Sequence, residues 1–337
     1  MNYFEKSCGL FREIGNVNGE SEALNNLGAT EDNLGEEQKS LEYLVDALKL
    51  RQKLGNKRGQ ANTLMNLAHT HSNLGDSQAA IDALTRAVEL WRAMRSREGE
   101  ANALINLAGV YIDLGQYKLA RDYLNQAIDD AVAAKDRREQ ASAYNDLGTV
   151  CGLQGQSAEA ATYYTKALNI AQAAGIKIVE IYALGNLADI AEGAGQHDRA
   201  LALYNQALLL SRSAKRPRRE ARLLEAVGKT HYAMRDMARA TSAFKGALDI
   251  AVHVADPATQ AAALYWTARV DHEAGKNVEA ERSARAAIGV FEGMRARVVS
   301  PELRASYFAT VQDAYDLEIA LLLGLDKEQP GRGYSAT

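Results

Sequence analysis

The stretch ESEALNNLGATEDNLGEEQKSLEYLVDALKLRQKLGNKRG, residues 20–59, decides the fold, because the chain repeats its pattern every 40 residues. Steps of 40 from Ala47 meet alanine at 87, 127, 167, 207, 247 and 287. Glycine recurs in the same register from Gly35 to Gly275, except that Arg235 replaces it once. Self-similarity at a fixed period of this length is typical of a linear repeat protein.

The sequence of each 40-residue repeat predicts two helices. In the first copy, apolar residues at helical spacing predict helices over residues 20–33 and 36–54. Gly35 ends the first helix in a left-handed conformation, and residues 55–58 turn the chain into the next copy. Arg235 predicts a turn that is either strained or differently built. The recurrent alanine predicts close contact between the paired helices.

This pattern resembles the tetratricopeptide repeat (TPR). The resemblance rests on Leu-Gly at 27–28 and 147–148, Leu-Ala at 67–68, 107–108 and 187–188, and the alanine series. The unit of 40 residues, rather than 34, resembles the longer repeats of kinesin light chains. The resemblance implies an all-α, right-handed superhelical solenoid of antiparallel helix pairs, capped by a C-terminal helix.

The repeat register divides the chain into four parts. Residues 1–19 form the second helix of a truncated repeat, and 20–299 form seven TPR units of 40 residues. Residues 300–325 form a capping or connector helix, with Ser300 as N-cap and Leu303 and Tyr307 on its apolar side, and 326–337 form a disordered tail. Because a solenoid normally begins with a polar cap, the open first seam predicts a fragment of a longer chain.

The last helix carries a second resemblance. The segment MRARVVSPELRASYFATVQDAYDLEIALLL, residues 294–323, resembles the connector between TPR arrays and CHAT domains of bacterial proteins. CHAT domains are caspase-like, so the resemblance implies a regulatory or scaffold arm of such a protein. Only twelve residues follow Leu325, and no catalytic residue transfers to this chain.

Composition argues against several functions. The net charge of −4 gives no reason to expect a nucleic acid or membrane partner. Cys8 and Cys151 match no metal spacing, and His69 and His71 are two residues apart, which points them to different helix faces. We expect free, inert thiols, no cofactor, no enzyme activity and a cytoplasmic location, since the N-terminus lacks an apolar signal core.

Asparagine recurs on the first helices and is the main candidate for a binding site. Asn26, Asn66, Asn106 and Asn186 share one repeat position with Asp146, and their neighbours include Asn25, Asn62, Asn102, Asn145 and Tyr182. In the TPR fold the first helices line the concave wall, so the resemblance implies a ladder of amides there. Such amides either bind the backbone of an extended peptide or bond to one another and hold the repeats in register.

Charge changes along this predicted wall. Asp146, Asp189 and Glu192 lie in the middle repeats, and Arg222, Lys229 and Arg269 lie in the last two. This polarity predicts a segment whose basic part lies over the middle and whose acidic part lies near the end. The basic run RSAKRPRREAR, residues 212–222, is either a solvated connection or a site for an acidic partner.

The sequence therefore predicts a protein–protein interaction module that binds a protein or peptide segment in its concave groove. Two other functions stay open: a TPR receptor for a signalling peptide, and a structural spacer without a groove ligand.

Overall fold

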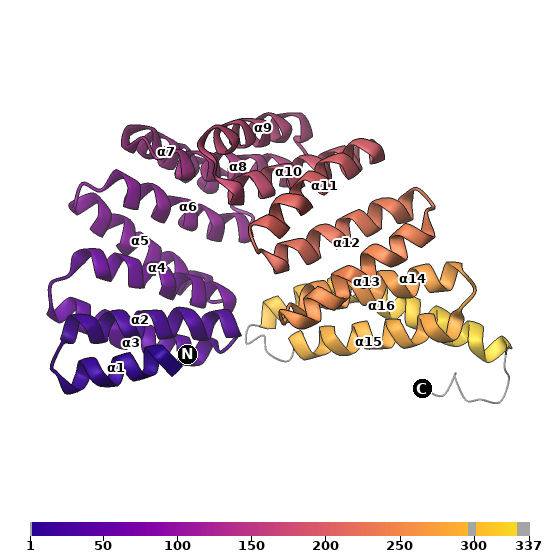
Figure 1. Cartoon of the computed structure of the whole chain (residues 1–337), viewed down its shortest axis with the longest axis horizontal. Coiled ribbons are helices and arrows are strands. Elements are labelled where there is room, and N and C mark those ends of the chain that lie inside the picture. Colours follow the sequence, from indigo (N-terminus) through magenta and orange to yellow (C-terminus); the bar gives the residue numbers. More distant parts are fainter. Residues whose placement is uncertain (1, 296–300, 329–337) are drawn as a thin grey trace. The chain divides into compact units, whose positions relative to one another are not determined.

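The computed structural model describes residues 2–295 and 301–328, and every element within these ranges is an α-helix (Figure 1). The helices form two compact units, called unit 1 up to Ala174 and unit 2 from Gly175. Unit 1 contains α1 (Asn2–Glu13), α2 (Val17–Leu34), α3 (Glu37–Lys53), α4 (Lys57–Asn73), α5 (Ser77–Ala93), α6 (Arg97–Asp113), α7 (Tyr117–Ala134), α8 (Arg137–Leu153) and α9 (Ser157–Ala174). Unit 2 contains α10 (Lys177–Gly193), α11 (His197–Ser213), α12 (Pro217–Ala233), α13 (Met237–His253), α14 (Pro257–Glu273), α15 (Asn277–Arg295) and α16 (Pro301–Glu328). The predicted all-α repeat array is confirmed in these ranges.

Helix pairs build each unit. The even-numbered helices from α2 to α14 are the first helices of the repeats, and each packs against the helix that follows it. Short connections make the two helices of a pair antiparallel. Side chains cap several first helices; Asn56, for example, accepts a hydrogen bond from the Gly59 amide at 2.9 Å. Neighbouring first helices, such as α6 and α8, also contact each other.

Left-handed residues end the helices at two repeat positions. The glycines of the predicted series, from Gly35 to Gly275, all have positive φ. Arg235, which stands at the same repeat position, takes the same left-handed conformation, with φ of 62°. A second series lies between repeats and was not predicted. It comprises Gly15, Gly55, Arg95, Lys135, Gly175, Lys215 and Ala255, all with positive φ. Non-glycine residues adopt this conformation at a cost, because Cβ crowds the following carbonyl.

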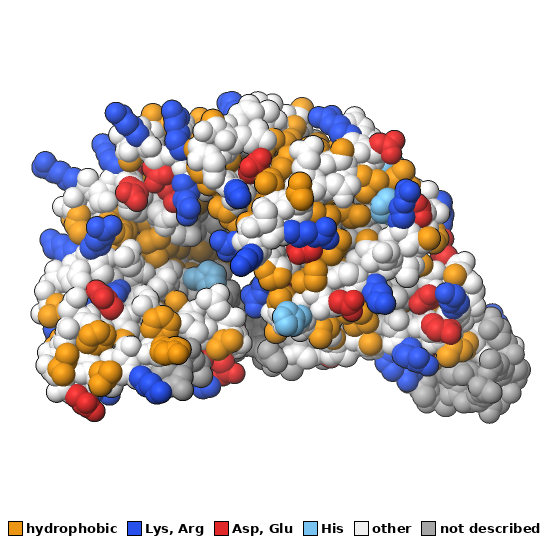
Figure 2. Space-filling view, viewed as in Figure 1, with side chains coloured by type: hydrophobic (Ala, Val, Ile, Leu, Met, Phe, Trp, Pro, Cys, Tyr) orange, Lys and Arg blue, Asp and Glu red, His pale blue; other side chains and the backbone are white. Residues whose placement is uncertain are grey.

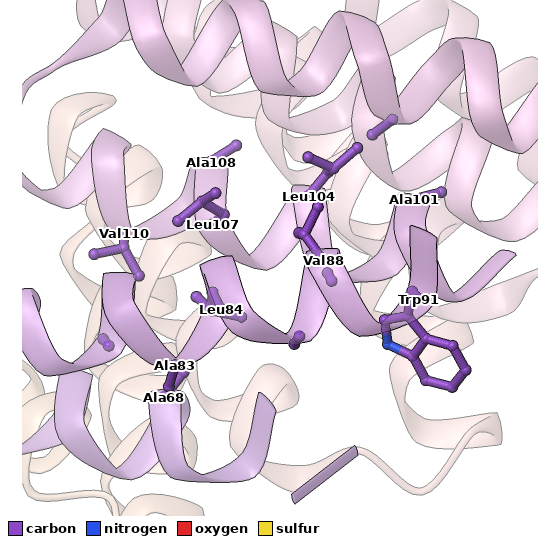
Figure 3. Packing of buried hydrophobic residues seen from close by; sticks show 14 of the residues in the cluster. Ala68, Ala83, Leu84, Val88, Trp91, Ala101, Leu104, Leu107, Ala108 and Val110 are labelled. Atoms are coloured by element: carbon purple, nitrogen blue, oxygen red, sulfur yellow. The ribbon is translucent and has the colours of Figure 1, made fainter. Parts of the chain in front are cut away.

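The alanine series lies in the core, as predicted. Ala47, Ala87, Ala127, Ala167, Ala207, Ala247 and Ala287 are each 0% exposed. Ala87 and Ala127 belong to one core cluster with Leu84 of α5 and with Leu104 and Leu107 of α6. Figure 3 shows these three leucine side chains between the helices. A larger side chain at the alanine position would push these helices apart.

In two repeats a glycine of the first helix lies directly against an aromatic ring of the second helix. A Cβ on Gly148 would lie 2.6 Å from the Tyr164 ring, and a Cβ on Gly228 would lie 2.5 Å from the Phe244 ring. Repeats with the smaller leucine at the ring position, such as Leu84, tolerate alanine at the glycine position, here Ala68. In these two repeats the glycine makes room for the ring, whereas the equivalent positions of a third repeat hold Ala188 and Tyr204.

Residue size is also matched across the junctions between repeats. The last turn of a second helix carries Phe11, Arg51 or Trp91, and each lies against a glycine of the next first helix, at Gly19, Gly59 and Gly99 respectively. At later junctions the second helix carries the small residue and the next first helix carries the larger one. By register these junctions place Ala131 with Glu139, Ser211 with Arg219 and Ala251 with Thr259.

The C-terminal helix α16 packs on α15 and α14, and its Leu321 is buried with Ala268, Ala280 and Ala284. The helix extends to Glu328, so the prediction of a disordered tail from residue 326 places that boundary too early. The predicted N-cap Ser300 and the side chains of Leu303 and Tyr307 lie outside the described residues. No described helix combines the length and the apolar character needed to cross a membrane.

Candidate functional site

The first amides of the predicted ladder bond to neighbouring repeats. The Asn25 side-chain oxygen accepts hydrogen bonds from Arg51 Nη1 at 3.2 Å, Thr63 Oγ1 at 3.0 Å and Asn66 Nδ2 at 3.3 Å. Arg51 also donates to the Gly59 carbonyl at 2.9 Å, and its pKa is lowered by burial. These bonds join α2, α3 and α4, which is the arrangement expected of residues that keep repeats in register.

The next amides also have partners inside unit 1. Asn102 Nδ2 donates to Glu139 Oε1 at 2.9 Å, and Asn106 Nδ2 donates to the Asn102 carbonyl at 3.0 Å. Asn145 Nδ2 donates to Asp146 Oδ1 at 3.3 Å. In the described part of unit 1, only Asn26 and Asn62 of the predicted ladder are exposed amides whose side chains have no hydrogen-bond partner.

Asp146 has a raised pKa. The side chain is half-buried, and this desolvation raises its pKa to about 6, although the bond from Asn145 acts in the opposite direction. The charge of Glu139 adds to the upward shift. Asp146 is therefore partly protonated near pH 6, which weakens its predicted role as a fixed negative charge.

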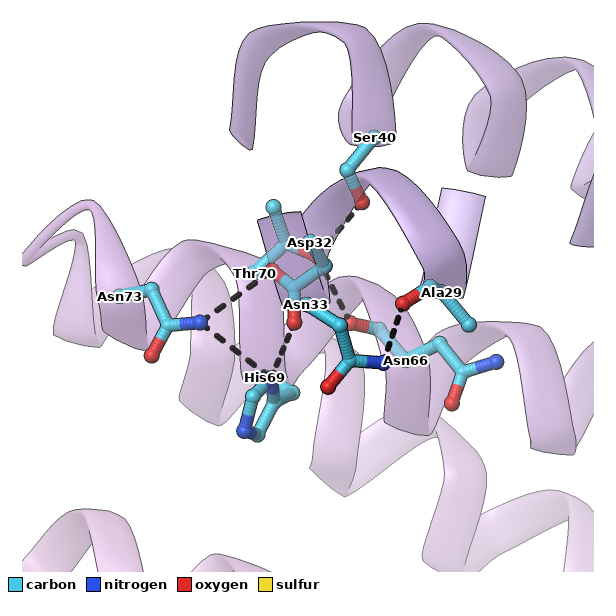
Figure 4. Close-up of polar contacts among 8 residues, drawn as sticks. All are labelled: Ala29, Asp32, Asn33, Ser40, Asn66, His69, Thr70 and Asn73. Atoms are coloured by element: carbon cyan, nitrogen blue, oxygen red, sulfur yellow. Dashed lines mark hydrogen bonds and ion pairs between the residues drawn. The ribbon is translucent and has the colours of Figure 1, made fainter. Parts of the chain in front are cut away.

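A second polar network, absent from the sequence predictions, joins α2 to α4 (Figure 4). His69 Nδ1 lies 2.6 Å from Asp32 Oδ2, and Asn73 Nδ2 donates to Asp32 Oδ1 at 3.2 Å. Burial acts to raise the Asp32 pKa, but these partners outweigh it and lower the pKa. The spacing of about 40 residues between partners is the sequence signal that could have found this network.

In unit 2 the equivalent helix face is aromatic and cationic. The Arg219 guanidinium lies 4.6 Å from the centroid of the Tyr182 ring. It occupies the space above Gly185, where a Cβ would overlap it. The Arg219 pKa is lowered by burial, and its Nε has no hydrogen-bond partner among the described residues. Tyr182 itself is 42% exposed.

Arg269 lies among three aromatic rings. Its guanidinium carbon is 5.0 Å from the Trp266 centroid, 5.2 Å from that of Tyr232 and 6.0 Å from that of Tyr265. Lys229 Nζ lies 5.7 Å from the Trp266 centroid. Within the described ranges, neither Arg219 nor Arg269 has a carboxylate at ion-pair distance.

The other predicted residues of unit 2 are engaged with neighbours. Arg222 Nε lies 3.5 Å from Asp256 Oδ2, and Lys229 pairs with Glu225. The Tyr204 hydroxyl donates to Asp189, whose pKa burial raises. Asn186 is half-buried on the same helix as Asp189.

Tyr182 was predicted, but Tyr232, Tyr265 and Trp266 were missed because only amides and charged residues were followed along the other repeats. Tyr265 and Trp266 stand at the repeat positions of Asn25 and Asn26, so steps of 40 would have found them. Acidic and basic side chains are otherwise interspersed on the visible face of each unit (Figure 2). No group of three metal-binding side chains occurs among the residues that the structure describes. Cys8 and Cys151 are both buried, and burial raises their pKa values.

The family model of the tetratricopeptide repeat matches residues 19–93, 99–173 and 180–252. The chain belongs to the tetratricopeptide repeat family. No curated protein sequence matches the chain.

Several solved TPR-like structures resemble this TPR chain. BtubC from P. vanneervenii is 22% identical, with a TM-score of 0.58 over 67% of this chain and 94% of its own. A Rap protein in complex with Competence and Sporulation Factor is 14% identical, with a TM-score of 0.63 over 83% and 76%. Aspartyl phosphate phosphatase F from Bacillus subtilis is 14% identical, with a TM-score of 0.62 over 83% and 73%. At these identities the likeness shows the fold alone.

Proposed function

We propose that the chain is a protein-interaction module, without enzyme activity, that binds an extended protein or peptide segment on the first-helix face of unit 2. The observation that carries this proposal is the pair Arg219 and Arg269, which lie on aromatic rings and have no carboxylate at ion-pair distance among the described residues. Such cations attract acidic side chains, so the segment carries Asp or Glu where it meets α12 and α14.

The surroundings of the two arginines favour binding over a structural role. Arginine, tyrosine and tryptophan dominate the binding energy of protein interfaces. A guanidinium already held on a ring loses less side-chain entropy when it binds a carboxylate, and its planar fork suits two hydrogen bonds. The exposed ring of Tyr182 and the half-buried ring of Trp266 add apolar contact beside the charge.

One structural relative supports binding by this fold, since a Rap protein was solved in complex with Competence and Sporulation Factor. Two finer proposals rest on the sequence alone. The segment 294–323 supports a role as the regulatory arm of a CHAT protein, with a CHAT domain as its partner. Neither nucleic acid nor membrane is expected as a partner at a net charge of −4.

For unit 1 we propose that most of the amide ladder holds the repeats in register. The contacts of Asn25, Asn66 and Asn102 with neighbouring helices support this register-keeping role. The exposed amides Asn26 and Asn62 remain available for a partner.

The test uses the Trp91→Phe variant, which leaves Trp266 as the remaining one of the two tryptophans. A blocked peptide of alternating Gly and Glu is titrated while Trp266 emission and binding heat are recorded, with a Gln peptide as the neutral control. Binding of the Glu peptide that weakens about tenfold in Arg269→Gln supports the proposal. The exposed Lys245, on α13, supplies the matched control Lys245→Gln, which should bind as the parent does. Equal binding of both peptides, or an Arg269→Gln variant that binds unchanged, would contradict it.

A further inference from the structure

Unit 1 contains a small pocket between the first turns of its first helices. Asn62 of α4, Glu98, Gly99 and Asn102 of α6, Glu139 of α8 and Trp91 of α5 line it. Its volume is about 160 Å³. Sites for drug-sized molecules occupy roughly 300–1,000 Å³, whereas a cavity of about 150 Å³ holds one benzene. The pocket therefore suits one side chain.

The pocket exists because of the size match at one junction. Trp91 lies against Gly99, where a Cβ would come within 2.8 Å of several ring atoms. The next junction has Ala131 in place of the large residue and places Glu139 at the position of Gly99. A tryptophan wall and a carboxylate are thus brought to the same pocket from two successive junctions.

The charges of the pocket are not balanced. Glu139 is 9% exposed and receives one side-chain hydrogen bond, from the neutral Asn102 amide. No cation lies at ion-pair distance from Glu139 or from Glu98 in the part of the chain that the structure describes. Burial raises the Glu139 pKa and outweighs the Asn102 hydrogen bond and the charge of Arg138, which both act to lower it. Arg58, which also lines the pocket, pairs with neither carboxylate.

The Trp91 side chain that forms one wall of the pocket also lacks a hydrogen-bond partner within residues 2–295 and 301–328. Trp91 is 6% exposed, and its indole N–H has no acceptor among the described residues. A buried acceptor without a cation and a buried donor without an acceptor are both costly. A basic residue of a peptide offers the cation that Glu139 lacks, and the Trp91 ring offers apolar surface to its aliphatic stem.

We propose that this pocket binds a single Lys or Arg side chain of a partner segment, with the cation at Glu139 and the aliphatic stem against Trp91. The proposal rests on the proposed function for the nature of the partner, but on different residues in the other unit. A neutral side chain of the same length would leave Glu139 without a cation, and an acidic one would be repelled.

The test uses Trp266→Phe, which leaves Trp91 as the reporter in the pocket. Blocked pentapeptides of glycine with a central Lys, Arg, norleucine or Glu are titrated, with Trp91 emission and binding heat as readouts. We expect saturable binding of the Lys or Arg peptide, at least about tenfold tighter than that of the norleucine peptide. Glu139→Gln, which keeps the side-chain shape, should remove this preference. Glu89→Gln, an exposed change on the helix of Trp91, should leave it intact.

Equal binding of the Lys and norleucine peptides would overturn the proposal, because the pocket would then be only an apolar hollow. An unchanged preference in Glu139→Gln would overturn it as well. Asn62→Ala, an exposed change in the pocket lining, provides a second variant whose folding is not at risk, and it should weaken binding of the preferred peptide. Failure here leaves the acidic-peptide titration at Trp266 unaffected, so the two proposals are judged separately.

Discussion

Gly228 lies directly against the ring of Phe244, and a Cβ at this glycine would come within 2.5–2.9 Å of three ring carbons. Phe244 is 0% exposed, so its ring has little room to move. Gly228→Ala should therefore lower the free energy of unfolding by about 1–3 kcal/mol, as overpacked cores do. Urea unfolding measures the loss.

The same pair offers a rescue. Adding Phe244→Leu to Gly228→Ala creates the combination that Ala68 and Leu84 already form in another repeat. We expect the double variant to be more stable than the sum of its single changes predicts, by about 1 kcal/mol or more. Strict additivity of the two changes would show that the ring and the glycine are not coupled.

Asp146 should make stability depend on pH. Its pKa is about 6 in the folded chain against 3.8 ordinarily, so the folded state keeps its proton to higher pH than the unfolded state. Stability should therefore fall as pH rises from about 4 to 6. Asp146→Asn lacks this dependence and also restores the asparagine found at 26, 66, 106 and 186.

We expect the free energy of unfolding of Asp146→Asn to exceed that of the parent by about 1–2 kcal/mol at pH 7. This is less than the full free energy that corresponds to a shift of about two pKa units. The advantage should shrink towards pH 4. Chemical unfolding at both pH values checks this, and a constant difference between the two proteins would argue against a raised pKa.

Asn25 and Asn26 separate the two roles of the amide ladder. Asn25 accepts three hydrogen bonds from buried or half-buried groups, so Asn25→Ala should cost about 1–3 kcal/mol. Asn26 is exposed, and Asn26→Ala should change stability by less than about 0.5 kcal/mol. Thermal unfolding of both variants tests the contrast, which similar melting temperatures would disprove.

Ala255 tests the second series of left-handed turns. Its φ is 50°, a conformation that glycine adopts without crowding. Ala255→Gly should raise the free energy of unfolding by about 0.5–1 kcal/mol, although glycine also gains freedom in the unfolded chain. Ala258→Gly, at an exposed helical position of α14, should instead destabilise the protein.

The sequence predicted the elements of the fold well because helix ends and core alanines recur at a period of 40. For Arg235 the register left two alternatives, a strained turn or a differently built one, and the structure shows the strained left-handed conformation. The contacts of individual side chains did not follow from the register. Asn25 and Asn26 are neighbours of the same type, yet one is bonded across repeats and the other is exposed, because helix rotation points them to different sides.

The candidate site was predicted less well for a related reason. Arg269 and Lys229 were found by their charge, but Tyr265 and Trp266, which hold them, occupy positions where other repeats carry amides. Whether a cation on the first-helix face of unit 2 can bind a partner depends on whether its neighbours are aromatic rings or carboxylates. Neighbours on adjacent helices are about 40 residues away in sequence, so a local motif does not reveal them.

The size match at the junctions also limits how such a chain can change by duplication or loss of repeats. Gly228 and Phe244 belong to one repeat, so a copied repeat inherits both members of that pair. When repeats are counted as helix pairs, Trp91 lies on α5 and Gly99 lies on α6 of the next pair, so each copied pair inherits one half of two different junctions. A duplicated repeat inserted elsewhere would meet the wrong partner size at one end. New repeats should therefore survive more readily when they are copied in runs or when the junction residues change with them.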